Sequence, residues 1–308
     1  MPTIRQIQMV RTLAEHRHFT RAANALGVTQ SALTKSLQAL EDELGVRLFD
    51  RGTGEPEPTL FGGIVLDHGR TLLRDMSELV REIDLAKGLE TGGITVSASV
   101  FPSELWAPQA LGRLAEAHPR LNCVLRAGDA RQAVDDVSEG VSDVAIADAA
   151  EAEGRDNLDS EILATTRLAM FCRPEHPLAR RRVVRPNDLL EYPFAGPPLP
   201  RALVGRDLLK LVRTAFSVAP GGQLVPRLSV GSFSAMARMV LHSNALGWAP
   251  EVLLADDFRH GVFRQLKTDA PAIGATFALF TRRNRTPSPA TIEFVQLVKA
   301  MLPSGARQ

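Results

Sequence analysis

The chain has few of the features that mark secreted, membrane-spanning and metal-binding proteins. Its 308 residues include two cysteines, Cys123 and Cys172, which are far apart and belong to no Cys-x-x-Cys or Cys/His cluster. No run approaches the ~20 apolar residues of a membrane span. The N-terminal segment lacks the apolar core and cleavage site of a signal peptide. We therefore expect buried free thiols, no metal site, no membrane contact and a cytoplasmic location.

The chain also lacks an excess of charge of one sign and the motifs of common enzymes. Its 36 Lys and Arg residues nearly balance 35 Asp and Glu residues, so the formal net charge is +1. A net charge this small does not itself indicate a nucleic-acid ligand, so the distribution of charge matters more. No G-x-S-x-G, P-loop or dinucleotide fingerprint occurs, and the seven histidines are scattered. An enzyme is the least favoured class.

A helix-turn-helix pattern is present in residues 19–48. Thr20 is suited to cap a first helix that ends near Leu26, and Gly27 supplies the permissive backbone of a sharp turn. Thr29 is suited to cap a second helix that runs to about Leu44. Leucines at i, i+4, i+7 and i+11 predict one buried face: Leu33, Leu37, Leu40 and Leu44. A helix that enters the DNA major groove needs a polar face opposite, and here that face carries Ser31, Thr34, Lys35 and Gln38.

The charged residues of this segment are also distributed unevenly, with bases near the turn and acids at the far end. Arg21 and Lys35 lie near the turn, whereas three acids close the far end of the second helix: Glu41, Asp42 and Glu43. This distribution favours a helix whose N-terminal half meets DNA. A small helical bundle with solvated charges remains the alternative on this evidence alone.

The segments around the helix-turn-helix have patterns of their own. A first helix is predicted from about Ile4 to Glu15, and residues 49–59, with two prolines, predict a short two-stranded wing or loop. From about Leu60 a long helix follows, with one apolar seam and no nearby core, which favours a dimerising or linking helix. The seam residues expected to join two copies are Val65, Leu72, Met76, Leu79 and Ile83. A helix packed on its own domain is the alternative.

Beyond a glycine-rich hinge at residues 88–93, short apolar runs alternate with amphipathic helices. Strands are predicted near residues 94–99, 121–126, 144–147, 167–173, 228–230, 247–249 and 276–280. Helices are predicted near residues 104–117, 130–139, 202–214, 232–243 and 289–302. This alternation is typical of a mostly parallel sheet covered by helices, so the fold class expected is α/β.

The N-terminal segment resembles the LysR-type transcriptional regulators. The matching pattern, F-T-R-A-A-x-x-L-x-V-T-Q-S-A-L-T-x-x-L-x-x-L-E-x-E-L-G-V-x-L-F-x-R, runs from Phe19 to Arg51. Three later segments resemble effector-domain signatures of this family: HPRLNCVLRAG (118–128), GVSDVAIAD (140–148) and GWAP (247–250). The resemblance spans almost the full length and becomes weaker after Asp148. The chain departs from the family pattern at Ser31, where a proline is common, and in the wing, where Glu55 and Glu57 replace the usual arginines.

This resemblance implies a three-part architecture that is α/β overall. It comprises a winged helix-turn-helix DNA-binding domain (1–60, mainly α), a dimerisation or linker helix (61–90) and an effector-binding domain (91–308). The last part would have two lobes, like a type 2 periplasmic binding protein, joined by crossover strands near residues 162–168 and 265–272. Lobe one would comprise about residues 91–164 and 269–302, and lobe two about residues 165–268.

Two kinds of DNA contact are expected. We hypothesise that five residues face the major groove: Gln30, Ser31, Thr34, Lys35 and Gln38. Gln pairs well with adenine and Lys with guanine acceptors, whereas Ser and Thr are less selective. Arg21, Thr29 and Arg51 are expected to hold phosphates and set the register. For Arg51, tying the wing to the helices is an equal alternative, and the acidic wing is expected to add little affinity because carboxylates repel phosphates.

The resemblance also places an effector cleft at strand ends and helix starts. Its implied residues are Ser99, Val100, Phe101, Ser103, Asp148, Gly196, Pro197, Pro198, Ser232 and Phe233. Asp148 is the most informative of these, because a carboxylate in a cleft disfavours an anionic ligand and favours hydroxyl or ammonium groups. We therefore expect a neutral polar or sugar-like effector rather than a carboxylate. Trp106 and Trp248 are expected in the core, with stacking on the ligand as the alternative.

The function expected is a sequence-specific DNA-binding transcriptional regulator that a small molecule switches, with no cofactor. The implied partners are double-stranded promoter or operator DNA, the effector, RNA polymerase and further copies of the chain, as a dimer or a tetramer. The main rival is a solute-binding protein without a DNA role, because the C-terminal region resembles one. The missing export signal and the fused helix-turn-helix argue against that rival.

Overall fold

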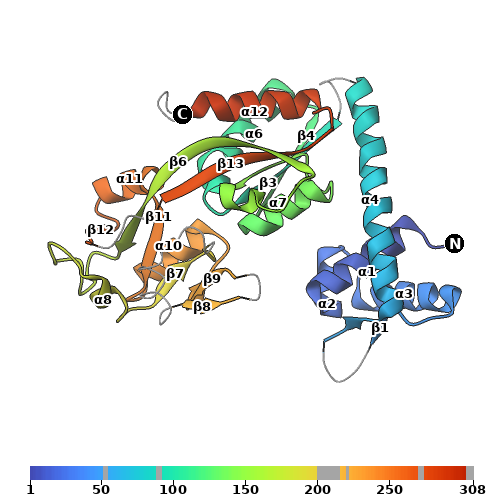
Figure 1. Ribbon diagram of the computed structural model, residues 1–308, viewed down its shortest axis with the longest axis horizontal. Helices are drawn as coiled ribbons and strands as arrows, with labels where there is room; N and C mark the ends of the chain where they lie inside the picture. The colour runs from blue at the N-terminus through green and yellow to red at the C-terminus, as the bar shows by residue number, and fades with distance from the viewer. Residues whose placement is uncertain (51–54, 88–91, 200–215, 220–221, 270–273, 303–308) are drawn as a thin grey trace. The chain divides into compact units, whose positions relative to one another are not determined.

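The computed structural model describes residues 1–50, 55–87, 92–199, 216–219, 222–269 and 274–302 (Figure 1). The chain divides into two compact units, Met1–Ile83 and Asp84–Gln308. Within the described residues, no helix combines the length and the apolar character needed to cross a bilayer.

The N-terminal unit consists of three helices, a short wing and the start of a long helix. α1 (Ile4–His16), α2 (Phe19–Ala25) and α3 (Gln30–Leu44) precede the antiparallel wing strands β1 (Phe49–Asp50) and β2 (Glu57–Pro58). Burying a leucine or phenylalanine side chain contributes about 1.5–3 kcal/mol, so a small core can hold this unit together. That core contains Met9, Val10, Leu13, Ala22, Ala23, Leu33, Leu37, Leu40, Leu48 and Phe49.

The helix boundaries confirm two of the sequence predictions and correct two others. Thr29 caps α3, accepting a hydrogen bond from the amide of Ala32 at 3.2 Å, and Gly27 adopts a left-handed φ of 64° in the turn. The prediction that Thr20 caps α2 is wrong: α2 begins at Phe19, which packs against the core, and its N-cap residue is His18. Leu44 is not part of the buried stripe, because α3 ends there and Leu44 is 38% exposed.

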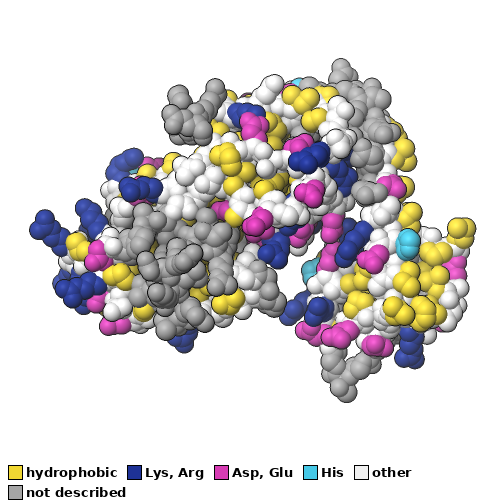
Figure 2. Space-filling view, in the orientation of Figure 1, with side chains coloured by type: hydrophobic (Ala, Val, Ile, Leu, Met, Phe, Trp, Pro, Cys, Tyr) yellow, Lys and Arg dark blue, Asp and Glu magenta, His cyan; other side chains and the backbone are white. Residues whose placement is uncertain are grey.

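The long helix α4 (Leu60–Lys87) has two different apolar sides. One side lies against the rest of the N-terminal unit: Gly62 approaches Leu48, Gly69 approaches Ile7, and Val65 and Leu66 pack on the core. A methyl group on Gly69 would lie 2.6 Å from the side chain of Ile7, so only glycine permits this close approach. The other side is a stripe of residues that are 43–51% exposed: Leu72, Met76, Leu79 and Ile83 (Figure 2). We call these four residues the α4 stripe. Val65, the fifth predicted seam residue, is half-buried and packs against the core.

Lobe one of the second unit is a sheet with helices on both faces. β3 (Gly92–Ser99) lies between β4 (Leu121–Gly128) and β5 (Val144–Asp148), and the three strands are parallel. β13 (Gly274–Arg282) pairs antiparallel with β5 and with the 15-residue strand β6 (Leu158–Cys172). Figure 1 shows α6 (Ala107–Ala117) and α12 (Pro289–Met301) over one face and α7 (Ala130–Ser138) on the other. Two short helical segments follow strand ends: α5 (Pro102–Leu105) and the 3-10 turn η2 (Ala149–Ala152).

Lobe two uses the second half of β6 as one of its own strands. Its sheet has the order β10 (Leu228–Ser229), β7 (Phe194–Gly196), β11 (Leu246–Pro250) and β6, and β12 (Arg264–Leu266) also pairs with β6. β6 pairs with β13 as far as Arg167 and with β11 from Leu168, so it crosses from one lobe to the other. The remaining elements are β8 (Phe216–Val218) and β9 (Leu224–Pro226), with helices α8 (Pro186–Leu189), α10 (Phe233–Leu241) and α11 (Glu251–Arg259).

Most predicted elements of this unit exist, with changed boundaries. The helix predicted at 104–117 is two helices that meet at Trp106, and Gly92 and Gly93 belong to β3 rather than to a hinge. The helix predicted at 202–214 lies outside the described residues. Sequence patterns missed the short strands β7, β8, β9 and β12, because strands of three residues carry too little periodicity. They also missed the helix α11.

Candidate DNA-binding helix and effector cleft

α3 presents a polar surface to solvent opposite its leucine side. Gln30, Ser31, Lys35 and Gln38 are exposed, and Thr34 is half-buried. The hydroxyl of Thr34 donates to the backbone carbonyl of Gln30 at 2.9 Å, which leaves that hydroxyl's lone pairs free to accept from a DNA base. Side chains of this kind at the start of a helix can reach base edges in the major groove.

The first turn of α3 is held by hydrogen bonds to the residues before it. The hydroxyls of Thr29 and Ser31 lie 3.0 Å apart, and the hydroxyl of Thr20 donates to Oε1 of Gln30 at 3.3 Å. Thr20 therefore orients a predicted base-reading side chain instead of capping α2. Arg21 is exposed, as a phosphate contact requires. Arg51 lies outside the described residues.

Glu41 has a structural role that its position in the sequence does not suggest. Its side chain is 8% exposed, and its carboxylate accepts hydrogen bonds from the amides of Leu48 at 2.8 Å and Phe49 at 3.4 Å. This acid fixes the start of the wing and does not belong to a solvated acidic end. Glu55 and Glu57 of the wing are exposed, so their charges face whatever the wing approaches.

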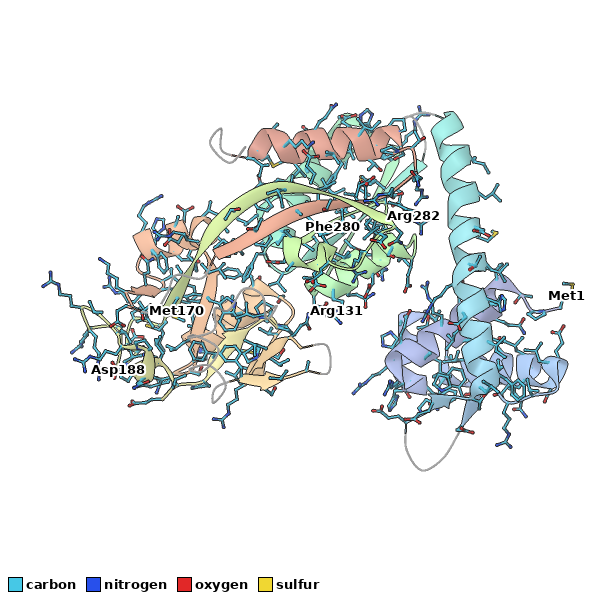
Figure 3. All side chains as sticks on the ribbon, viewed as in Figure 1. Met1, Arg131, Met170, Asp188, Phe280 and Arg282 are labelled. Carbon is cyan, nitrogen blue, oxygen red and sulfur yellow. The ribbon has the colours of Figure 1, made fainter. Side chains whose placement is uncertain are left out.

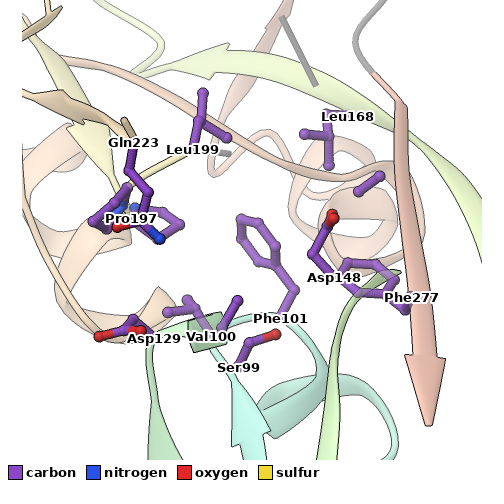
Figure 4. A pocket seen from close by; sticks show the side chains of 13 residues that line it. Ser99, Val100, Phe101, Asp129, Asp148, Leu168, Pro197, Leu199, Gln223 and Phe277 are labelled. Carbon is purple, nitrogen blue, oxygen red and sulfur yellow. The ribbon is translucent and has the colours of Figure 1, made fainter. Parts of the chain in front are cut away.

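A cavity lies between the two lobes of the second unit, at the carboxyl ends of β3 and β5 (Figure 4). Its empty space is about 500 Å³, a figure that includes space open to solvent. Lobe one lines it with Ser99, Val100, Phe101, Asp129, Ala130, Asp148, Ala275 and Phe277, and Leu168 comes from the point where β6 crosses between the lobes. Lobe two lines it with Pro197, Pro198, Leu199 and Gln223.

Six of the ten predicted cleft residues line this cavity: Ser99, Val100, Phe101, Asp148, Pro197 and Pro198. The other four are not among its described lining residues. Ser103 donates to the carbonyl of Val100 at 2.9 Å, and Ser232 caps α10 through the amide of Ala235. Gly196 lies against the ring of Trp248, and Phe233 packs near Phe171.

Asp148 carries a nearly buried carboxylate at the C-terminal end of β5. It is 6% exposed, and its Oδ1 accepts a hydrogen bond from the amide of Ala150 at 2.9 Å. Burial raises the pKa of Asp148 above its ordinary value, and the Ala150 amide opposes that shift in part. The second acid of the cavity, Asp129, is exposed and caps α7 through the amide of Gln132.

A buried polar network holds α7 on the sheet behind the cavity. The Asp136 carboxylate accepts hydrogen bonds from Oγ of Ser97 at 2.7 Å, from Nε2 of Gln132 at 2.9 Å and from Nε of Arg126 at 3.1 Å. At the other end of α7, Arg282 of β13 donates to the carbonyl of Ser138 at 2.7 Å (Figure 3). These contacts position the start of α7, where Asp129 and Ala130 border the cavity.

Trp106 and Trp248 are core residues, as predicted, with exposed fractions of 8% and 2%. Cys172 is buried, and burial raises its pKa to about 12, whereas Cys123 is half-buried; both are free thiols. In the part of the chain that the structure describes, no group of three His, Cys, Asp or Glu side chains is placed to hold a metal ion.

Comparison with known proteins identifies both units. The family model described as "Bacterial regulatory helix-turn-helix protein, lysR family" matches residues 4–63, and that described as "LysR substrate binding domain" matches residues 87–303. The chain belongs to the LysR family. Members of the LysR family are DNA-binding transcriptional regulators and not enzymes, so this chain is a DNA-binding regulator under the control of a ligand.

Individual LysR relatives are similar over nearly the whole chain. The SDS degradation transcriptional activation protein of a Pseudomonas species is 34% identical, over 94% of this chain and 93% of the relative. Two solved structures share the fold: a full-length AphB variant (TM-score 0.62, 15% identity, 97% and 98% coverage) and the LysR regulator CbnR (TM-score 0.56, 18% identity, 98% and 100% coverage).

Proposed function

We propose that residues 1–60 bind operator DNA, residues 61–90 join two copies and residues 91–308 bind the effector. The observation that carries the DNA assignment is the exposed polar side of α3 above its buried leucines. Gln30, Ser31, Thr34, Lys35 and Gln38 read bases, while Arg21, Thr29 and Arg51 hold phosphates. The protein acts in the cytoplasm, where it contacts RNA polymerase once it is bound at a promoter.

The chain works as a homodimer or a homotetramer in this proposal. The α4 stripe supports it, since four large apolar side chains at helical spacing stay exposed on a helix that packs on its own unit through earlier residues, among them Gly62 and Gly69. Two such stripes pack as a coiled coil and bury each other. A dimer of this kind reads two half-sites separated by helical turns of DNA.

The effector binds in the cavity between the lobes and is not a carboxylate. Asp148 supports this, because a second anion would have to enter beside a nearly buried acid. The sequence suggests a neutral polar or sugar-like compound with groups that donate hydrogen bonds to Asp148. Closure of the lobes on it shifts the population of DNA-binding arrangements.

Replacing Lys35 with alanine tests the DNA assignment. A good base contact contributes about 1–3 kcal/mol of discrimination, so Lys35→Ala should weaken binding to the protein's own site by about 5- to 150-fold. Binding to random DNA of the same length should change less, because base contacts carry the sequence preference. Fluorescence anisotropy with the DNA upstream of the gene measures both affinities at one moderate salt concentration.

Lys299→Ala is the matched control. It removes the same charge from the second unit, where Lys299 is exposed and pairs with Glu161 at 2.7 Å. This control should bind both DNAs like the unmodified protein. If Lys35→Ala also binds its own site like the unmodified protein, the groove assignment is wrong.

A further inference from the structure

The cavity between the lobes is lined mainly by apolar side chains. Of the 13 lining residues that the structure describes, only Ser99, Asp129, Asp148 and Gln223 have polar side chains. The other nine are hydrophobic, and they come from both lobes and from the crossing strand β6: Val100, Phe101, Ala130, Leu168, Pro197, Pro198, Leu199, Ala275 and Phe277. Such a wall favours a ligand with an apolar body, because burial of apolar surface contributes about 25 cal/mol per Å².

The charged groups among these lining residues are both acids. No Lys, Arg or His belongs to the lining that the structure describes. Arg131, next to the lining residue Ala130, pairs with the buried Glu151 at 3.8 Å and is therefore directed to another acid. An anionic ligand would meet Asp129 and Asp148 with no lining cation to neutralise it.

Asp148 can accept more hydrogen bonds than the protein gives it. A carboxylate has about four acceptor positions, and for Asp148 the described residues supply one donor, the Ala150 amide. Figure 4 shows the carboxylate directed from the end of its strand into the space that Phe101 and Leu168 also border. A ligand that enters this space must bring a donor, or it leaves a desolvated carboxylate without a partner.

We propose that the effector is an amphipathic molecule with an apolar body and one head group that is not anionic and donates hydrogen bonds to Asp148. The head is a hydroxyl or an ammonium group. This inference rests on the proposed function, which places the effector in this cavity, and it replaces the sugar-like compound that the sequence suggests with one that has an apolar body. A sugar carries hydroxyls on all sides, so several would face Val100, Leu199 and Phe277 without partners.

A series of ligands with one chain and different heads tests this inference on the full-length protein. Isothermal titration calorimetry is performed with 1-hexanol, hexylamine, hexanoate and glucose. The alcohol or the amine, or both, should bind with Kd of order 1 mM, as expected for about seven non-hydrogen atoms. Hexanoate should bind at least about tenfold more weakly, because its carboxylate meets Asp148, and glucose should bind more weakly still. The tighter of the two favoured ligands identifies the head group.

Paired variants then locate the head. Asp148→Asn should weaken hexylamine about ten- to hundred-fold, as loss of a hydrogen bond to a charged group predicts, and should improve hexanoate. Asp159→Asn is the control, because this acid is exposed and does not line the cavity, and it should change either affinity less than about threefold.

Several results would overturn the inference. They are hexanoate or glucose binding as tightly as the alcohol and the amine, no binding of either favoured ligand at about 10 mM, or equal effects of the two variants. The ligand series uses the unmodified chain, so it decides the matter even if Asp148→Asn does not fold. A chain that binds its operator but prefers hexanoate disproves this inference and the exclusion of a carboxylate effector while the DNA-binding assignment stands, whereas absence of DNA binding disproves that assignment.

Discussion

Replacing Gly62 with alanine should weaken the packing of α4 on the wing, whereas the same change at the next residue should not. Gly62 is buried, and a methyl group there would overlap the backbone carbonyl oxygen of Leu48. Gly63 has no atom of a neighbouring element within 4 Å of such a methyl group. The two residues lie side by side in the first turn of α4, so they differ mainly in what surrounds them.

The expected difference follows from two opposing effects. Alanine in place of glycine favours a helix by up to about 1 kcal/mol, and both variants have this gain. Overpacking costs about 1–3 kcal/mol, and here the obstacle is a backbone atom, which cannot turn aside as a side chain can. The free energy of unfolding of the N-terminal unit should therefore be about 1–3 kcal/mol lower in Gly62→Ala than in Gly63→Ala.

The assay has to separate the two units. Both tryptophans, Trp106 and Trp248, lie in the second unit, so tryptophan fluorescence follows the unfolding of that unit in urea. The circular dichroism of helices includes the N-terminal unit, and hydrogen exchange of peptides from α1 to α3 isolates it. With m values of about 1–3 kcal/mol per molar urea, the two variants should differ by about 1 M in midpoint.

The outcome that contradicts this reasoning is equal protection of α1 to α3 in Gly62→Ala and Gly63→Ala. Equal values would mean that the wing shifts at no cost. A lower urea midpoint of tryptophan fluorescence in Gly62→Ala would contradict this reasoning as well, because Gly62 belongs to the N-terminal unit and the tryptophans to the second.

Three further predictions concern the α4 stripe and the titration of buried groups. Leu72→Lys should convert dimers to monomers in sedimentation velocity, whereas Thr71→Lys, at an exposed polar position beside it, should not; a dimeric Leu72→Lys would refute the role of the stripe. Burial raises the folded-state pKa of Asp148 above 3.8, so this group stabilises the fold at low pH and loses that contribution as pH rises. Asp148→Asn should therefore raise the urea midpoint of tryptophan fluorescence at pH 7, and an unchanged or lower midpoint would contradict this. Burial lowers the pKa of His176 below 6.5, so the second unit should lose stability as pH falls below 6.5, and His176→Gln should show a smaller loss in the same titration.

The DNA-binding unit was largely predictable, because local patterns determine it. The spacing of Leu33, Leu37 and Leu40 predicts both the helix and its buried side, and Thr29 and Gly27 predict where it starts and what precedes it. The prediction that Thr20 caps α2 was wrong because Phe19 packs against the core as the first residue of that helix.

The effector cavity was predictable only in part. The family resemblance assigned Ser99 and Asp148 to the cleft, and both end neighbouring parallel strands, whose carboxyl ends meet at one edge of the sheet. Leu168, Gln223 and Phe277 could not be assigned, because they come from the crossing strand β6, from a short hairpin and from the late strand β13, whose places depend on long-range pairing. The apolar character of the site could therefore not be predicted from the sequence, because it depends on how the two lobes come together.

The sequence by itself determined the helix-turn-helix, its family and the presence of an acid at the end of β5, because each depends on residues close together in the chain. Only the tertiary structure decided that Glu41 is buried under the wing, that one side of α4 is packed while the stripe stays exposed, and that Asp148 sits among hydrophobic walls. Burial and desolvation are set by which distant segments meet, and local sequence does not specify that.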